Sequence, residues 1–98
     1  MANEDSEIKT LRLRIEGFVQ AVGYRNYAIA EANRLKLDGW IRNRADGTVE
    51  ALVSGPVKDV EAFVTAAMRG PAGSTVKNVM MKTDPPPEEK GFHRRPSI

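Results

Sequence analysis

The feature that most constrains the fold is a strict alternation of apolar and polar residues in TLRLRIEG, residues 10–17, followed closely by a helical pattern. Leu11, Leu13 and Ile15 occupy every second position, and charged residues stand between them. This period of two predicts a half-buried strand. The alanine-rich stretch YRNYAIAEANRLKL, residues 24–37, instead repeats its apolar residues at helical spacing. The chain is therefore expected to pass from a strand into a helix through a short loop.

A similar order recurs in the rest of the chain. WIRN, residues 40–43, and TVEALV, residues 48–53, predict the two strands of a hairpin with its turn at Ala-Asp-Gly. PVKDVEAFVTAAMRG, residues 56–70, predicts a second helix, because proline suits the first helical position and glycine the exit. STVKNVMMKT, residues 74–83, predicts a further strand. FHRRPSI, residues 92–98, predicts an optional short edge strand that its proline limits.

The order β-α-β-β-α-β predicts an α+β protein of the ferredoxin-like type. We expect an antiparallel sheet of four to five strands with two helices on one face. Residues 1–7 are polar and are expected to form a flexible N-terminal segment, and residues 8–98 a single domain. The N-terminus is acidic and lacks the apolar segment of a signal peptide, and no apolar run approaches the ~20 residues of a membrane span. A cytoplasmic location is therefore expected.

Composition excludes several kinds of site. The chain has no cysteine and a single histidine, His93, so disulfide frameworks, thiol nucleophiles and multi-histidine metal sites are excluded. Fifteen Lys and Arg against 13 Asp and Glu give a net charge of +2, too balanced to indicate nucleic-acid binding. A modest positive excess suits a small anionic ligand.

The loop between the first strand and the first helix carries the candidate site. GFVQAVGYR, residues 17–25, joins a glycine-framed loop to a helix N-terminus that contains Arg25. A cation in the first helical turn is disfavoured by roughly 0.3–1 kcal/mol, and a bound anion would reverse that sign. Free amides at the helix start and a guanidinium both favour phosphate. The segment therefore predicts a phosphate cradle, although it lacks the Gly-Lys-Ser/Thr of a Walker loop.

The predicted topology brings Asn43 to the same edge of the sheet. The first strand and the first hairpin strand run in the same direction, with the second hairpin strand between them. Their ends then lie two strand spacings apart, roughly 10 Å. An arginine side chain can cover much of that gap, so Arg25 and Asn43 are expected to face one small site. Asn43 alone would also suit the turn that follows it.

Two motifs together resemble those of the acylphosphatase family. GFVQAVGYR is similar to the family's pattern of glycine, a basic residue, Val-Gln-Gly-Val and a following arginine. GWIRNRADGTVEALVSGP, residues 39–56, is similar to its Gly-Trp-Val-x-Asn and Asp-Gly-x-Val-Glu stretches. The similarity runs from about Leu11 to Val79, and the end GFHRRPSI resembles the family's C-terminal strand.

This resemblance implies the ferredoxin-like fold and a monomeric hydrolase that cleaves small acyl phosphates to a carboxylate and inorganic phosphate. It implies no metal, no cofactor, and no nucleic-acid or membrane partner. By the same resemblance Arg25 would bind the phosphoryl group and Asn43 would orient the attacking water. The phosphate-binding backbone amides would be those of Val19, Gln20, Ala21, Val22, Gly23 and Tyr24. This chemistry needs positioning and charge stabilisation more than a strong base, because an acyl phosphate is already activated.

Two departures from the family pattern keep a second function open. Phe18 stands where the family has a basic residue, and Ala21 stands where it has glycine. If position 21 needs a positive φ, alanine costs ~1–2 kcal/mol there. The alternative is therefore a catalytically weak or inactive phosphate-binding domain of the same fold. A third reading, an RNA-binding sheet that uses Arg12 and Arg14 on its open side, ranks last because the strands lack the expected aromatic residues.

Overall fold

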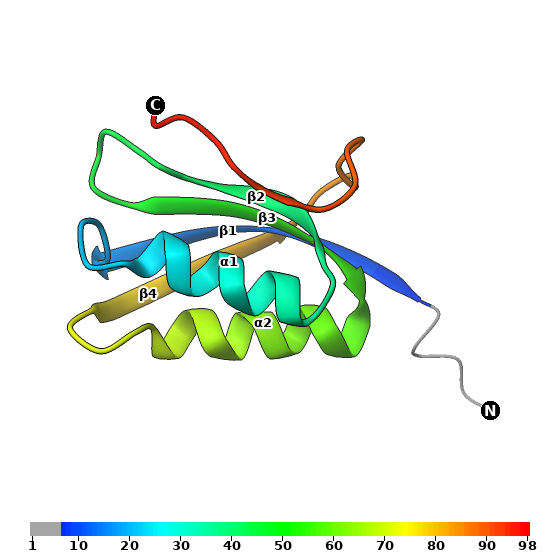
Figure 1. Cartoon of the computed structure of the whole chain (residues 1–98), viewed down its shortest axis with the longest axis horizontal. Coiled ribbons are helices and arrows are strands. Elements are labelled where there is room, and N and C mark those ends of the chain that lie inside the picture. Colours follow the sequence, from blue (N-terminus) through cyan, green and yellow to red (C-terminus); the bar gives the residue numbers. More distant parts are fainter. Residues whose placement is uncertain (1–6) are drawn as a thin grey trace.

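The computed structural model describes residues 7–98 and consists of a five-stranded sheet with two helices on one face (Figure 1). The elements follow in the order β1 Ile8–Phe18, α1 Tyr24–Arg34, β2 Asp38–Asn43, β3 Val49–Pro56, α2 Val57–Arg69, β4 Thr75–Thr83 and β5 Phe92–Arg94. Apart from Glu7, the segment that we expect to be flexible lies outside the described residues. No helix in the described part of the chain is long and apolar enough to span a bilayer.

The sheet has the order β4-β1-β3-β2-β5, which agrees with the predicted ferredoxin-like fold. The first four strands are antiparallel to their neighbours, as expected, whereas β5 pairs with β2 in parallel and makes the sheet mixed. Because β1 and β2 are both antiparallel to β3 between them, β1, β2 and β5 all run in one direction. Their C-terminal ends therefore lie at the same edge of the sheet.

The core lies between the sheet and the helices. Leu11, Leu13 and Ile15 of β1 stand opposite buried partners on β3, so the alternation read from the sequence sets the buried face. The helices contribute their apolar stripes. The buried helical residues are Tyr24, Ala28 and Ala32 of α1 and Val60, Phe63, Ala66 and Ala67 of α2.

Helix α1 ends earlier than its periodicity suggests. The helical pattern runs to residue 37, but α1 ends at Arg34. Lys36 adopts a left-handed conformation with φ of 59°, and the Leu37 amide donates to the Ala32 carbonyl over 2.9 Å. This turn leads the chain into β2 and lets Leu37 pack in the core.

Candidate active site

The loop between β1 and α1 has two left-handed residues. Ala21 has φ of 62° and Gly23 has φ of 79°, so the backbone curls tightly before the helix. No side chain among the described residues caps α1, and the first backbone hydrogen bond of the helix runs from the Tyr27 amide to the Gly23 carbonyl. Within residues 7–98, none of the backbone N–H groups from Gln20 to Asn26 donates a hydrogen bond. These donors remain available to a ligand.

Contacts from other elements hold this loop in place. The side-chain Nε2 of Gln20 donates to the carbonyls of Arg44 and Thr48, over 2.9 and 2.8 Å, and ties the loop to the β2–β3 turn. The Tyr24 hydroxyl donates to the Ala67 carbonyl over 2.8 Å, which fixes the start of α1 against the end of α2. The loop and the β2–β3 turn lie at the same end of the molecule (Figure 1).

Arg25 and Asn43 line one cleft of about 170 Å³ at this end. Asn43 is the last residue of β2 and lies on the helix-facing side, two positions after the buried Ile41. Its side-chain Oδ1 is buried and has no hydrogen-bond partner within the described residues. The other lining residues are Val19, Ala21, Gly23, Tyr24, Asn26 and Arg94. Arg25 and Asn43, which were expected to face one small site, thus both line this cleft.

The cleft is electrostatically positive. Burial is the main cause that lowers the pKa of Arg25, and the positive charge of Arg94 lowers it further. Neither guanidinium forms an ion pair with a carboxylate in the part of the chain that the structure describes. The unpaired charge of Arg25 therefore costs free energy here, and a bound anion would remove that cost.

The two departures from the family pattern have different structural consequences. Ala21 does adopt a positive φ, so it carries the cost of ~1–2 kcal/mol that a left-handed conformation imposes on alanine. Phe18 is the last residue of β1, is 60% exposed, and does not line the cleft. Of the two departures, only Ala21 therefore changes the backbone energetics of the loop that lines the cleft.

Arg94 and Asn26 also line the cleft, although nothing in the sequence pattern marked them. Arg94 Nη2 donates to Asn26 Oδ1, which joins the end of β5 to the first turn of α1. The signal that could have found Arg94 is the period of two in β5. Phe92 is buried in the core, so the residue two positions later faces the same side.

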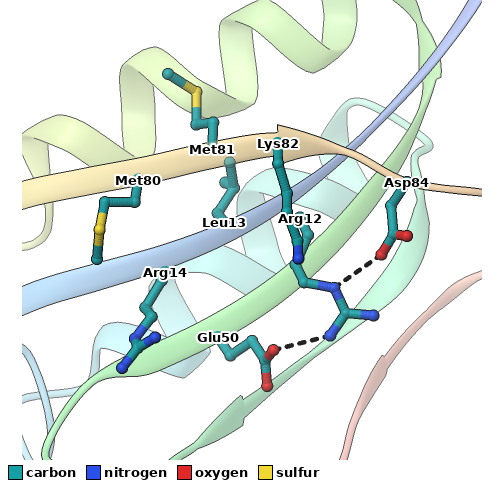
Figure 2. Close-up of a pocket in the computed structure, with 8 residues that line it drawn as sticks. All are labelled: Arg12, Leu13, Arg14, Glu50, Met80, Met81, Lys82 and Asp84. Carbon is teal, nitrogen blue, oxygen red and sulfur yellow. Dashed lines mark hydrogen bonds and ion pairs between the residues drawn. The ribbon is translucent and has the colours of Figure 1, made fainter.

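The open face of the sheet holds a second, larger cavity of about 360 Å³, shown in Figure 2. Arg12 lies there between two carboxylates, with Nη1 2.8 Å from Glu50 and Nε 2.7 Å from Asp84. Arg14 pairs with Asp46 over 3.0 Å. Both arginines lie on the open side, as expected, but their charges are already matched by protein groups. In the described residues no cluster of three or more metal-ligating side chains occurs on either face.

The family model described as acylphosphatase matches residues 11–94. The chain belongs to the acylphosphatase family. It is 45% identical over 91 residues to an acylphosphatase of Rhodospirillum rubrum, covering 93% of this chain and 100% of that protein. It is 44% identical over 97 residues to an acylphosphatase of an Azoarcus species, covering 99% of each chain. The crystal structure of acylphosphatase from Bacillus subtilis aligns with a TM-score of 0.84 and 33% identity, covering 91% of this chain and 99% of that one. These similarities confirm the fold and the enzyme class predicted from the sequence.

Proposed function

We propose that this protein hydrolyses small acyl phosphates to a carboxylate and inorganic phosphate at the cleft between the β1–α1 loop and the end of β2. The observation that carries the proposal is the buried, unpartnered Oδ1 of Asn43 in the same cleft as Arg25. A buried acceptor without a partner is costly, and a water molecule bound there would satisfy it.

In this mechanism the backbone amides from Val19 to Tyr24 and the Arg25 guanidinium hold the phosphoryl oxygens. Asn43 accepts a hydrogen bond from the attacking water and orients its oxygen toward phosphorus. The bond between phosphorus and the carboxyl oxygen breaks, and its electron pair leaves with the carboxylate. Both water protons end on the phosphate, whose own oxygens act as the base. The neutral amide of Asn43 only positions the water.

The positive φ of Ala21 favours one rival, an anion-binding domain of the same fold with weak or no turnover. Both functions require phosphate to bind in the cleft, and they differ only in turnover. We favour the enzyme because Arg25 and Asn43 are both present. The cytoplasmic location, the monomeric state, the independence from metals and the single domain over residues 8–98 stay predictions.

The test is hydrolysis of benzoyl phosphate in the presence of a metal chelator. The unmodified protein should turn over, and Arg25→Ala should lose about 10³-fold in kcat/KM, because it removes a charged donor at the reacting group. Arg34→Ala is a matched control on the same helix, because Arg34 is 64% exposed and pairs with Glu31. It should change kcat/KM by no more than about twofold.

Two outcomes would contradict the proposal. If Arg25→Ala hydrolyses benzoyl phosphate as fast as the unmodified protein, the reaction does not depend on this cleft. Absence of turnover in the unmodified protein, with phosphate still bound, would favour the anion-binding rival.

A further inference from the structure

Arg94 reaches the cleft from a strand that the catalytic motifs do not include. Strand β5 pairs in parallel with β2, and Arg94 stands beside Ile41, two positions before Asn43 on the neighbouring strand. Side chains alternate along β5. Phe92 is therefore buried in the core, Arg94 shares its face, and Arg95 lies on the other face, 5.0 Å from the Trp40 ring centroid.

Asn26 fixes the direction of the Arg94 side chain. Its Oδ1 accepts a hydrogen bond from Arg94 Nη2, and both residues line the same cleft as Arg25. The amide of Asn26 is neutral, so it orients the guanidinium without neutralising it. Arg94 is thereby oriented toward the cleft, and it has no carboxylate partner within the described residues.

The two guanidiniums then give the cleft more positive charge than one anchoring residue would supply. Like charges at one small site repel each other, and no carboxylate within residues 7–98 pairs with either of them. An acyl phosphate carries a dianionic phosphoryl group at neutral pH, and its hydrolysis releases phosphate of similar charge. Two cations match the charge of such a group better than one.

We propose that Arg94 is a second phosphoryl-binding residue, which shares the dianionic charge with Arg25 and is positioned by Asn26. This inference rests on the proposed function, since it concerns the same cleft and the same phosphoryl group. It assigns to Arg94 binding of substrate and of released phosphate, with no part in proton transfer. It also predicts that phosphate is a competitive inhibitor whose binding depends on Arg94.

The test compares Arg94→Gln with Arg95→Gln. The two variants lose the same charge at adjacent positions, but Arg95 lies on the open face over Trp40. The readout is the dissociation constant of inorganic phosphate, measured by titration calorimetry. Arg94→Gln should weaken phosphate binding about 10- to 100-fold, as expected for loss of a hydrogen bond between charged groups. Arg95→Gln should weaken it by less than about twofold, because its distant charge is screened.

The role of Asn26 is tested by a double-mutant cycle. Asn26→Ala should weaken phosphate binding less than Arg94→Gln does. In the Arg94→Gln background it should have no further effect, because it acts through the side chain that is already missing. Additive losses would overturn the positioning role of Asn26.

Equal phosphate affinity in Arg94→Gln and the unmodified protein would overturn the role of Arg94, as would equal losses in Arg94→Gln and Arg95→Gln. The comparison uses binding, so it decides the role of Arg94 whether or not the protein turns over. Absence of benzoyl phosphate hydrolysis would count against the proposed function alone.

Discussion

Two groups of arginines lie on opposite faces of the sheet and differ in what balances their charge. The rim pair, Arg25 and Arg94, has no carboxylate partner within the described residues. The open-face cluster, Arg12, Arg42 and Arg44, surrounds Glu50, with nitrogen–oxygen distances of 2.8, 2.8 and 3.2 Å. Residue type is the same in both groups, so the surroundings decide the role.

The pKa values of Arg12 and Arg25 shift in opposite directions. Hydrogen bonds to Asp84 and then to Glu50 raise the pKa of Arg12, because they favour its charged form. Burial and then the charge of Arg94 lower the pKa of Arg25. The open-face cluster also covers the otherwise apolar Trp40, since Arg12 and Arg42 stack over its ring at 5.4 and 4.8 Å. We infer that the open-face cluster stabilises the fold and that the rim pair binds an anionic ligand.

The largest expected effect separates Arg25→Gln from Arg12→Gln. Arg25→Gln should lose about 10³-fold in kcat/KM on benzoyl phosphate. It should leave the free energy of unfolding unchanged or higher, because an unpaired, partly buried cation is removed. Arg12→Gln should keep kcat/KM and lose about 1 kcal/mol of stability, because Arg12 is partly exposed and Glu50 keeps two other arginine partners. Urea unfolding measures the stability of both variants, and initial rates measure their kcat/KM. Equal changes in kcat/KM and in stability for the two variants would contradict the different roles of Arg25 and Arg12.

Glu50→Gln tests the open-face cluster alone. The Glu50 side chain is only 9% exposed, and the variant leaves three arginines without their shared carboxylate. We expect a loss of about 3 kcal/mol in the free energy of unfolding, as for a buried ion pair with one partner removed. The measurement is urea unfolding, with kcat/KM of the folded variant as the control. Unchanged stability would mean that the carboxylate is dispensable to the cluster.

Ala21→Gly tests strain on the rim side. Glycine removes the left-handed cost of ~1–2 kcal/mol at φ 62° but adds freedom to the unfolded chain. The net expectation is a gain of about 0.5–1 kcal/mol in the free energy of unfolding, with no decrease in kcat/KM. Thermal unfolding measures the gain. A loss of stability in Ala21→Gly would contradict the expected relief of backbone strain.

The smallest expected effect is a pH dependence at Asp46. Hydrogen bonds from the Thr48 side chain and then from its backbone amide lower the pKa of Asp46 to about 2. The unfolded chain, with an aspartate pKa of about 3.9, takes up the proton first as pH falls, so folded stability should decline between about pH 4 and pH 2. In Asp46→Asn the decline over this window should be shallower. Unfolding midpoints at several pH values measure it, and parallel pH profiles for the two proteins would contradict the expectation.

Much of this arrangement could be predicted from the sequence because it depends on local patterns. Alternation in β1 and the helical stripes set the layers, and short connections set the topology. Arg25 and Asn43 could be placed together because Asn43 ends β2 and Arg25 lies in the first turn of α1, after the short loop that leaves β1, and the topology fixes the directions of both strands. Their separation in sequence is large, but each lies near the end of a strand at the same edge.

The rest depends on contacts that sequence patterns do not specify. Arg94 enters the cleft only because β5 pairs in parallel with β2 after a long proline-rich loop, and that pairing partner is not encoded locally. The positive φ of Ala21 contradicts the preference of its residue type, so only the folded loop reveals it. The ion pairs of Arg12 likewise depend on Glu50 and Asp84, which are far from Arg12 in the sequence.

The most direct test of the account is a titration of the isotope-labelled protein with inorganic phosphate, followed by NMR chemical shifts of backbone amides and arginine Nε–H groups. We expect the largest changes at the backbone amides of residues 19–26 and at the side chains of Arg25 and Arg94. Changes centred on Arg12, Arg42 and Arg44 of the open face, with the loop amides unmoved, would contradict this expectation.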